Sequence, residues 1–129
     1  MLTLPSSVRV YLASEPTDMR RGFNGLSAVV EGCFGFDITL GHLFVFLNRR
    51  GDQAKCLFWD RTGLCILHKR LERGTIRRVR DARTGEHHIE IDAAELSLML
   101  EGIDLTDASR RKRFRREPSD GTRETDNRS

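Results

Sequence analysis

The sequence predicts an α+β fold, with a mainly antiparallel sheet and two amphipathic helices in a single domain. Three short apolar segments lie close together between residues 43 and 71, separated by turn residues. Apolar residues also recur at helical spacing in two places, before and after these segments. The chain has 129 residues and is 38% hydrophobic, which is enough for one core and hardly for two.

The apolar segments 43–47, 54–59 and 64–71 predict a three-stranded meander. Residues 48–52 and 60–63 contain the Asn, Asp and Gly of hairpin turns and join the three strands. The first segment is apolar throughout, which is typical of a strand that is covered on both faces. The middle segment alternates, so one face should carry Ala54, Cys56 and Phe58, and the other Lys55, Leu57 and Trp59.

Residues 8–13 predict an N-terminal strand, and a helix is expected to follow it. Thr17 after Pro16 is a plausible N-cap, and Asp18 would lie in the first turn, where the helix dipole favours an acid. The helix should pack on the sheet through an apolar stripe of Met19, Phe23, Leu26, Val30 and Phe34.

After the meander, residues 75–80 and 87–91 predict a second hairpin around a loop that contains Thr84 and Gly85. Asp92 and Glu95 then have the spacing of a capping box. They precede the apolar stripe of a second helix, formed by Leu96, Met99, Leu100 and Ile103. We therefore expect a compact domain over residues 1–104. Residues 105–129 are a basic tail with few apolar residues, and we expect this tail to be disordered.

Charge is segregated along the chain. Residues 1–80 carry 13 basic and 7 acidic groups, residues 81–109 carry 1 and 8, and residues 110–129 carry 8 and 4. This pattern is typical of proteins that contact nucleic acid or another protein. No apolar run approaches the roughly 20 residues of a membrane span, and the N-terminus lacks a signal-peptide pattern, so we expect a cytoplasmic protein without membrane contact. Three cysteines without metal-type spacing are expected to be small buried core residues: Cys33, Cys56 and Cys65.

The sequence offers little for catalysis. The most ligand-like cluster is His87, His88 and Glu90, but only His88 and Glu90 would share a face of a strand, and two ligands are too few for zinc. No phosphate-binding glycine loop or nucleophile elbow is present in the sequence. The acidic residues of the turns are explained as turn residues. We expect no catalytic site, no metal site and no cofactor.

Basic residues at the ends of the predicted elements are the remaining candidates for a site. They form either one phosphate-contacting patch or separate solvated charges, and charge alone does not decide between the two. The tail has six basic residues in the seven positions of RRKRFRR, which is typical of a nucleic-acid arm or of a tail for an acidic protein. The candidate DNA-binding residues are Arg20, Arg21, Arg49, Arg50, Lys55, Lys69, Arg70, Arg73, Arg110, Arg111, Lys112 and Arg113.

The chain resembles a known family. Three stretches between residues 5 and 104 carry the resemblance: VRVYLASEPTDMRRGFNGL, GHLFVFLNRRGDQAKCLFWDRTGLCILHKRLERG and AELSLMLEGID. They are similar to the TnpB accessory proteins, encoded by the second reading frame of the insertion-sequence 66 group of bacterial mobile elements. Where that pattern usually has an aromatic residue, Trp and Pro, this chain has Ile76, Arg77 and Arg78, and Leu105 replaces a further Trp. The basic tail lies outside the resemblance.

The resemblance implies a protein that assists transposition beside a larger transposase, and it implies no catalytic residue. The motif positions that match are Asp18, Arg20, Arg21, Gly22, Arg49, Arg50, Gly51, Asp52, Lys55, Trp59, Asp60, Gly63, Lys69, Arg70, Glu72 and Gly74. The leading hypothesis is a non-catalytic accessory factor that binds DNA through its basic surface. The alternative is an adaptor that docks on the transposase or on the other accessory protein of the element without contacting DNA. A metal-dependent nuclease is a distant third hypothesis, and the oligomeric state stays open.

Overall fold

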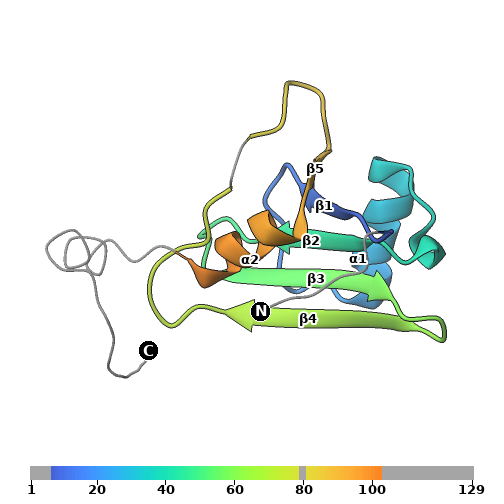
Figure 1. The fold of residues 1–129 in the computed structure, drawn as a ribbon, viewed down its shortest axis with the longest axis horizontal. Coiled ribbons are helices and arrows are strands. Elements are labelled where there is room, and N and C mark those ends of the chain that lie inside the picture. The colour runs from blue at the N-terminus through green and yellow to red at the C-terminus, as the bar shows by residue number, and fades with distance from the viewer. Residues whose placement is uncertain (1–6, 79–80, 103–129) are drawn as a thin grey trace, which may run out of the picture.

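A computed structural model of the chain describes residues 7–78 and 81–102. It contains a five-stranded mixed sheet in the order β4-β3-β2-β1-β5, built within a single small domain (Figure 1). The strands are β1 (Val10–Ala13), β2 (Leu43–Leu47), β3 (Gln53–Trp59), β4 (Leu64–Arg70) and β5 (His88–Ile91). The expected α+β class, with a mostly antiparallel sheet, is confirmed.

The predicted meander is present, because β2 pairs with β3 and β3 pairs with β4, both antiparallel. In contrast, β1 pairs with β2 in parallel, with Val10 opposite Leu43. Parallel neighbours need a crossover, and the segment between β1 and β2 provides it. This crossover contains the helix α1 (Phe23–Val29), the π-helix η1 (Val30–Phe34) and the 3-10 helix η2 (Ile38–Leu40).

Helices cover both faces of the sheet. The second helix, α2 (Ala93–Glu101), lies on the near face of the sheet in Figure 1, and α1 lies behind the sheet. On the α2 face, alternate residues of β2 such as Val45 pack with Leu96 and Met99. On the other face, Phe44 and Phe46 of β2 pack with residues of α1 and η1, among them Leu26, Val30 and Phe34. All five residues of β2 are buried, as the sequence predicts for a strand covered on both faces.

The predicted second hairpin is wrong. The strand β5 pairs with β1 instead, in an antiparallel register that sets Ile91 opposite Val10. Residues 76–78 form no strand. The backbone N–H of Ile76 donates to the carbonyl oxygen of Gly51 at 2.6 Å, which draws this segment to the turn between β2 and β3. The buried Ile76 side chain then joins the core on the α2 face.

The start of the first helix also differs from the prediction, since α1 begins at Phe23 and Thr17 is not its N-cap. The N–H of Thr17 donates to the carbonyl oxygen of Leu47 at 2.7 Å, which ties this residue to the end of β2. The carboxylate of Asp18 accepts the N–H of Arg20 at 2.9 Å and holds a local turn there. Such side chain to backbone bonds compete with helix formation, so the helix starts only after Gly22.

The capping box of α2 is confirmed. The carboxylate of Asp92 accepts the N–H of Glu95 at 2.7 Å, and Glu95 accepts the N–H of Asp92 at 2.9 Å.

The prediction that all three cysteines are buried is wrong in part. Cys56 is buried and Cys65 is half-buried, but Cys33 is exposed. No helix in the part of the chain that the structure describes is long and apolar enough to cross a membrane. The predicted end of the domain at Asp104 and the basic tail lie outside the described residues.

Candidate functional site

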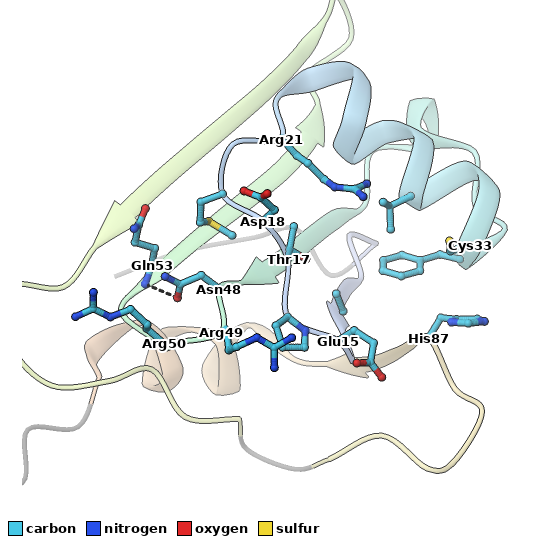
Figure 2. Close-up of a pocket in the computed structure, with 15 residues that line it drawn as sticks. Glu15, Thr17, Asp18, Arg21, Cys33, Asn48, Arg49, Arg50, Gln53 and His87 are labelled. Atoms are coloured by element: carbon cyan, nitrogen blue, oxygen red, sulfur yellow. Dashed lines mark hydrogen bonds between the residues drawn. The ribbon is translucent and has the colours of Figure 1, made fainter.

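A pocket opens at the carboxyl ends of β1 and β2. Its lining begins at Ala13, the last residue of β1, continues through the loop of residues 15–19, and includes the turn residues 48–50 that follow β2. Val29, Cys33 and Phe34 of the crossover helices form another wall. Figure 2 shows Cys33 on this side of the pocket, across from the turn of Asn48 and Arg49. The cavity volume is about 630 Å³.

The parallel pairing of β1 and β2 explains why a pocket forms at this edge. The carboxyl ends of parallel strands meet at the same edge of a sheet, and the loops that leave them surround a common space. Here the loop after β1 is fixed to β2 by the bond from Thr17 N–H to the Leu47 carbonyl. On the other side, the N–H of Ser14 donates to the carbonyl oxygen of His87 at 3.0 Å, which places His87 at the rim.

The turn that carries Arg49 and Arg50 is held by the side chain of Asn48. Its Oδ1 atom accepts the N–H groups of Gly51 at 2.9 Å and Gln53 at 3.0 Å, and its Nδ2 atom donates to Asp52 at 2.7 Å. The hydrogen bond from Asn48 lowers the pKa of the Asp52 carboxyl, so that Asp52 stays ionised. Both arginines are exposed on this turn, and both line the pocket. A fixed turn therefore presents two solvated guanidinium groups.

Arg21 is the third cation of the pocket, and its neighbour Arg20 behaves differently. The Nη2 atom of Arg20 lies 2.7 Å from the Oδ2 atom of Asp18. This side-chain hydrogen bond lowers the pKa of Asp18 to about 2. Arg21 lines the pocket, whereas Arg20 does not. Of the two arginines in the DMRRG motif, Arg20 neutralises an acid and Arg21 faces the pocket.

Lys55 does not lie on the surface. Its side chain is 9% exposed, and its Nζ atom donates to the carbonyl oxygens of Met19 at 2.8 Å and Arg21 at 2.7 Å. A buried ammonium group needs such partners, because an unpaired buried charge is very costly. Lys55 therefore holds the backbone of the 19–21 loop and is not part of the exposed basic surface.

The remaining predicted residues do not lie together. The Nζ atom of Lys69 donates to the carbonyl oxygen of Leu100 at 2.8 Å, near the C-terminal end of α2, where a cation is favourable. Arg70 is exposed and stands opposite Gln53 in the β3–β4 ladder, so it lies beside the turn of Arg49 and Arg50. Arg73 is exposed and follows β4. Residues Arg110, Arg111, Lys112 and Arg113 lie outside the described residues.

We name the three cations of the pocket, Arg21, Arg49 and Arg50, the arginine cluster. Sequence reasoning selected these residues but missed the pocket and its other lining residues, which include Glu15, Cys33, Asn48 and His87. The signal that would have found them is the parallel pairing of β1 with β2, since it brings residues 13–19 beside residues 48–50.

The described residues offer no cluster of metal ligands, and one of their thiols is deeply buried. No group of three His, Cys, Asp or Glu side chains within 7–78 and 81–102 is placed to hold a metal ion. Burial raises the pKa of Cys56 to about 11, so its thiol is protonated at neutral pH. The arrangement is suited to binding an anion through guanidinium groups.

Comparison with known proteins identifies the family. A family model described as "IS66 Orf2 like protein" matches residues 8–110. Two proteins of Sinorhizobium fredii (strain NBRC 101917 / NGR234) are similar over 104 residues. "Uncharacterized protein y4jC" is 35% identical, with 81% of this chain and 86% of the relative aligned. "Uncharacterized protein y4hO" is 40% identical, with 81% and 88% aligned. No solved structure matches. The chain therefore belongs to the IS66 Orf2-like family, a family of insertion-sequence accessory proteins.

Proposed function

We propose that this protein assists transposition as a non-catalytic factor that binds DNA through the arginine cluster. The observation that carries the proposal is that Arg21, Arg49 and Arg50 all line one pocket. These residues come from two segments that are far apart in the sequence. Membership of a family of insertion-sequence accessory proteins supplies the biological context.

The state of each cation supports phosphate binding. Arg49 and Arg50 are exposed and form no ion pair with the described acidic residues, unlike Arg20, which is bound to Asp18. A guanidinium group matches the geometry of a phosphate and binds it through two parallel hydrogen bonds. Because the supporting turn and loop are already held by Asn48 and Lys55, little further ordering is needed on binding.

Arg70 extends the cationic surface along β4. It is exposed and lies across the ladder from Gln53, which itself lines the pocket. A strip from the pocket to Arg70 would follow a phosphate backbone, since successive phosphates on one strand are several ångströms apart. The basic residues 110–116 would add contacts that do not depend on sequence.

The proposal is tested by fluorescence anisotropy with a labelled duplex from the element's terminal repeat and a scrambled duplex, at several salt concentrations. We use the full-length chain and a variant in which Arg110, Arg111, Lys112 and Arg113 are replaced by Gln. We expect the tail variant to bind duplex with an affinity that falls as salt rises. Complete loss of binding in the tail variant would contradict the proposal. Binding of the transposase by the nuclease-treated protein would then favour the adaptor hypothesis.

A further inference from the structure

We propose that the pocket receives one unpaired nucleotide of the bound DNA, with the phosphate of this nucleotide on the arginine cluster and its base inside the pocket. This inference rests on the proposed function, because the nucleotide belongs to DNA held at the same cluster. It adds a preference for DNA with a single-stranded or opened end. Such an end occurs wherever a strand has been cut or displaced.

The size of the cavity argues against a purely electrostatic surface. Contact with a duplex backbone requires only exposed cations, whereas this site is hollowed to about 630 Å³. That volume lies within the roughly 300 to 1,000 Å³ of sites that enclose small molecules. A paired base cannot enter such a pocket, because it is stacked inside the duplex. An unpaired nucleotide can turn its base into the pocket.

The walls of the pocket match the two halves of a nucleotide. Pro16, Val29 and Phe34 offer apolar surface to the flat base, and arginine guanidinium planes also stack on bases. Figure 2 shows Arg21 reaching toward the pocket from the 17–22 loop and Arg49 from the turn after β2. The two guanidinium groups thus come from different elements of the pocket wall.

Glu15 sets the orientation of the nucleotide in the pocket. It lies at the rim between Arg49 and His87 in Figure 2, and it is exposed. A carboxylate repels a phosphate and accepts hydrogen bonds from the amino groups of bases. The second acid of the lining, Asp18, is already paired with Arg20. The phosphate should therefore contact the arginines, while the edge of the base faces Glu15.

Cys33 permits a steric test of this pocket. It lines the pocket from η1 and its side chain is exposed, so a larger side chain fits the fold but fills the cavity. Ala28 is exposed on the preceding helix and does not line the pocket. The variants Cys33→Trp and Ala28→Trp thus place the same large side chain inside and outside the pocket. Neither substitution changes a charge.

The experiment measures the anisotropy of a labelled blunt duplex and of the same duplex with a four-nucleotide single-stranded extension. We expect the full-length protein to bind the extended duplex about tenfold more tightly, a difference of about 1.4 kcal/mol. Cys33→Trp should lose this preference and keep the affinity for the blunt duplex, while Ala28→Trp should keep both. Equal affinity of the unchanged protein for the two duplexes would overturn the inference and leave the proposed function standing.

Two further outcomes are decisive. A preference that persists in Cys33→Trp would place the unpaired nucleotide elsewhere and overturn the inference. Absence of binding to either duplex would overturn the proposed function, and the inference would fall with it.

A second experiment needs no substitution and tests the inference if Cys33→Trp does not fold. The extended duplex should slow alkylation of Cys33 by N-ethylmaleimide more than the blunt duplex does, with Cys65 as the internal reference. Equal protection by the two duplexes would also contradict the inference.

Discussion

The ammonium group of Lys55 lies 2.7 Å from the backbone carbonyl oxygen of Arg21. Through this bond, the interior strand β3 fixes the loop that carries one arginine of the pocket. The side chain of Lys55 is itself buried, so its charge serves the fold and not the surface. Position 55 thus connects the packing of β3 with the geometry of the arginine cluster.

Replacing Lys55 by Met should lower the free energy of unfolding by about 2 kcal/mol, because hydrogen bonds from a charged group to two carbonyl oxygens are lost. Urea denaturation measures this change. DNA affinity should fall as well, since the loop of Arg21 loses its support. Lys69→Met is the matched control. Lys69 is exposed, and its loss should change stability by no more than about 0.5 kcal/mol. Equal effects of the two substitutions would contradict the role of Lys55.

The pair of Asp18 and Arg20 predicts a pH effect. The Asp18 carboxyl should titrate with a pKa of about 2, below the ordinary value of 3.8, because Arg20 donates to the ionised form. The folded-state pKa is the lower one, so the pair stabilises the fold fully above pH 3.8 and loses this contribution as the pH falls toward 2. Carboxyl-carbon NMR of the Arg20→Ala variant should show a higher Asp18 midpoint. An unchanged midpoint would exclude Arg20 as the cause.

His88 predicts a second pH effect. Its ring lies 5.0 Å from that of Phe34 and 5.1 Å from that of Phe36, and its buried Nδ1 atom has no hydrogen-bond partner among the described residues. Burial lowers the pKa of His88 below its ordinary value of 6.5. Acidification below pH 6.5 should therefore cost stability, because the unfolded protein binds a proton at His88 more readily than the folded protein does. His88→Phe should therefore flatten the fall in stability between about pH 7 and 5. Urea titrations at each pH measure this fall, and an equal fall in the His88→Phe variant would exclude His88 as its cause.

Arg61 predicts a stabilising substitution. It has a φ of 89° in the turn between β3 and β4, where a non-glycine residue is strained. Arg61→Gly should raise the free energy of unfolding by about 1 kcal/mol, because glycine adopts this conformation without a Cβ clash. Thermal unfolding measures the change. A lower melting temperature would show that the Arg61 side chain makes a compensating contact.

Local patterns predicted the parts of the fold that depend on neighbours in sequence. The alternation of β3 and the spacing of Asp92 and Glu95 each predicted an element that the structure contains. These signals are short-range, since side-chain periodicity and capping act over only a few residues. The same reasoning placed Arg49 and Arg50 on a turn, where the structure has them.

Long-range pairing was not accessible from the sequence alone. The strand β5 has a period suited to a hairpin, but its choice of β1 as partner depends on the tertiary packing of Ile76 and Ile91. The pocket was missed for the same reason, because it results from the parallel register of β1 and β2. The burial of Lys55, in contrast, was indicated by the local sequence pattern. Lys55 shares a face of β3 with Leu57, whose side chain is fully buried, and a charge on such a face needs partners.

The most direct test of the account is the DNA affinity of the Arg49→Ala, Arg50→Ala double variant, measured by anisotropy over a range of salt concentrations. The control is the Arg9→Ala, Arg61→Gly double variant, which loses the same charge at the opposite end of the sheet. If both cluster arginines contact phosphate, the slope of log affinity against log salt should shrink by about 1.8, and affinity should fall for every sequence. The control should keep the slope of the unchanged protein. Equal slopes and affinities in the two double variants would contradict DNA binding by the arginine cluster.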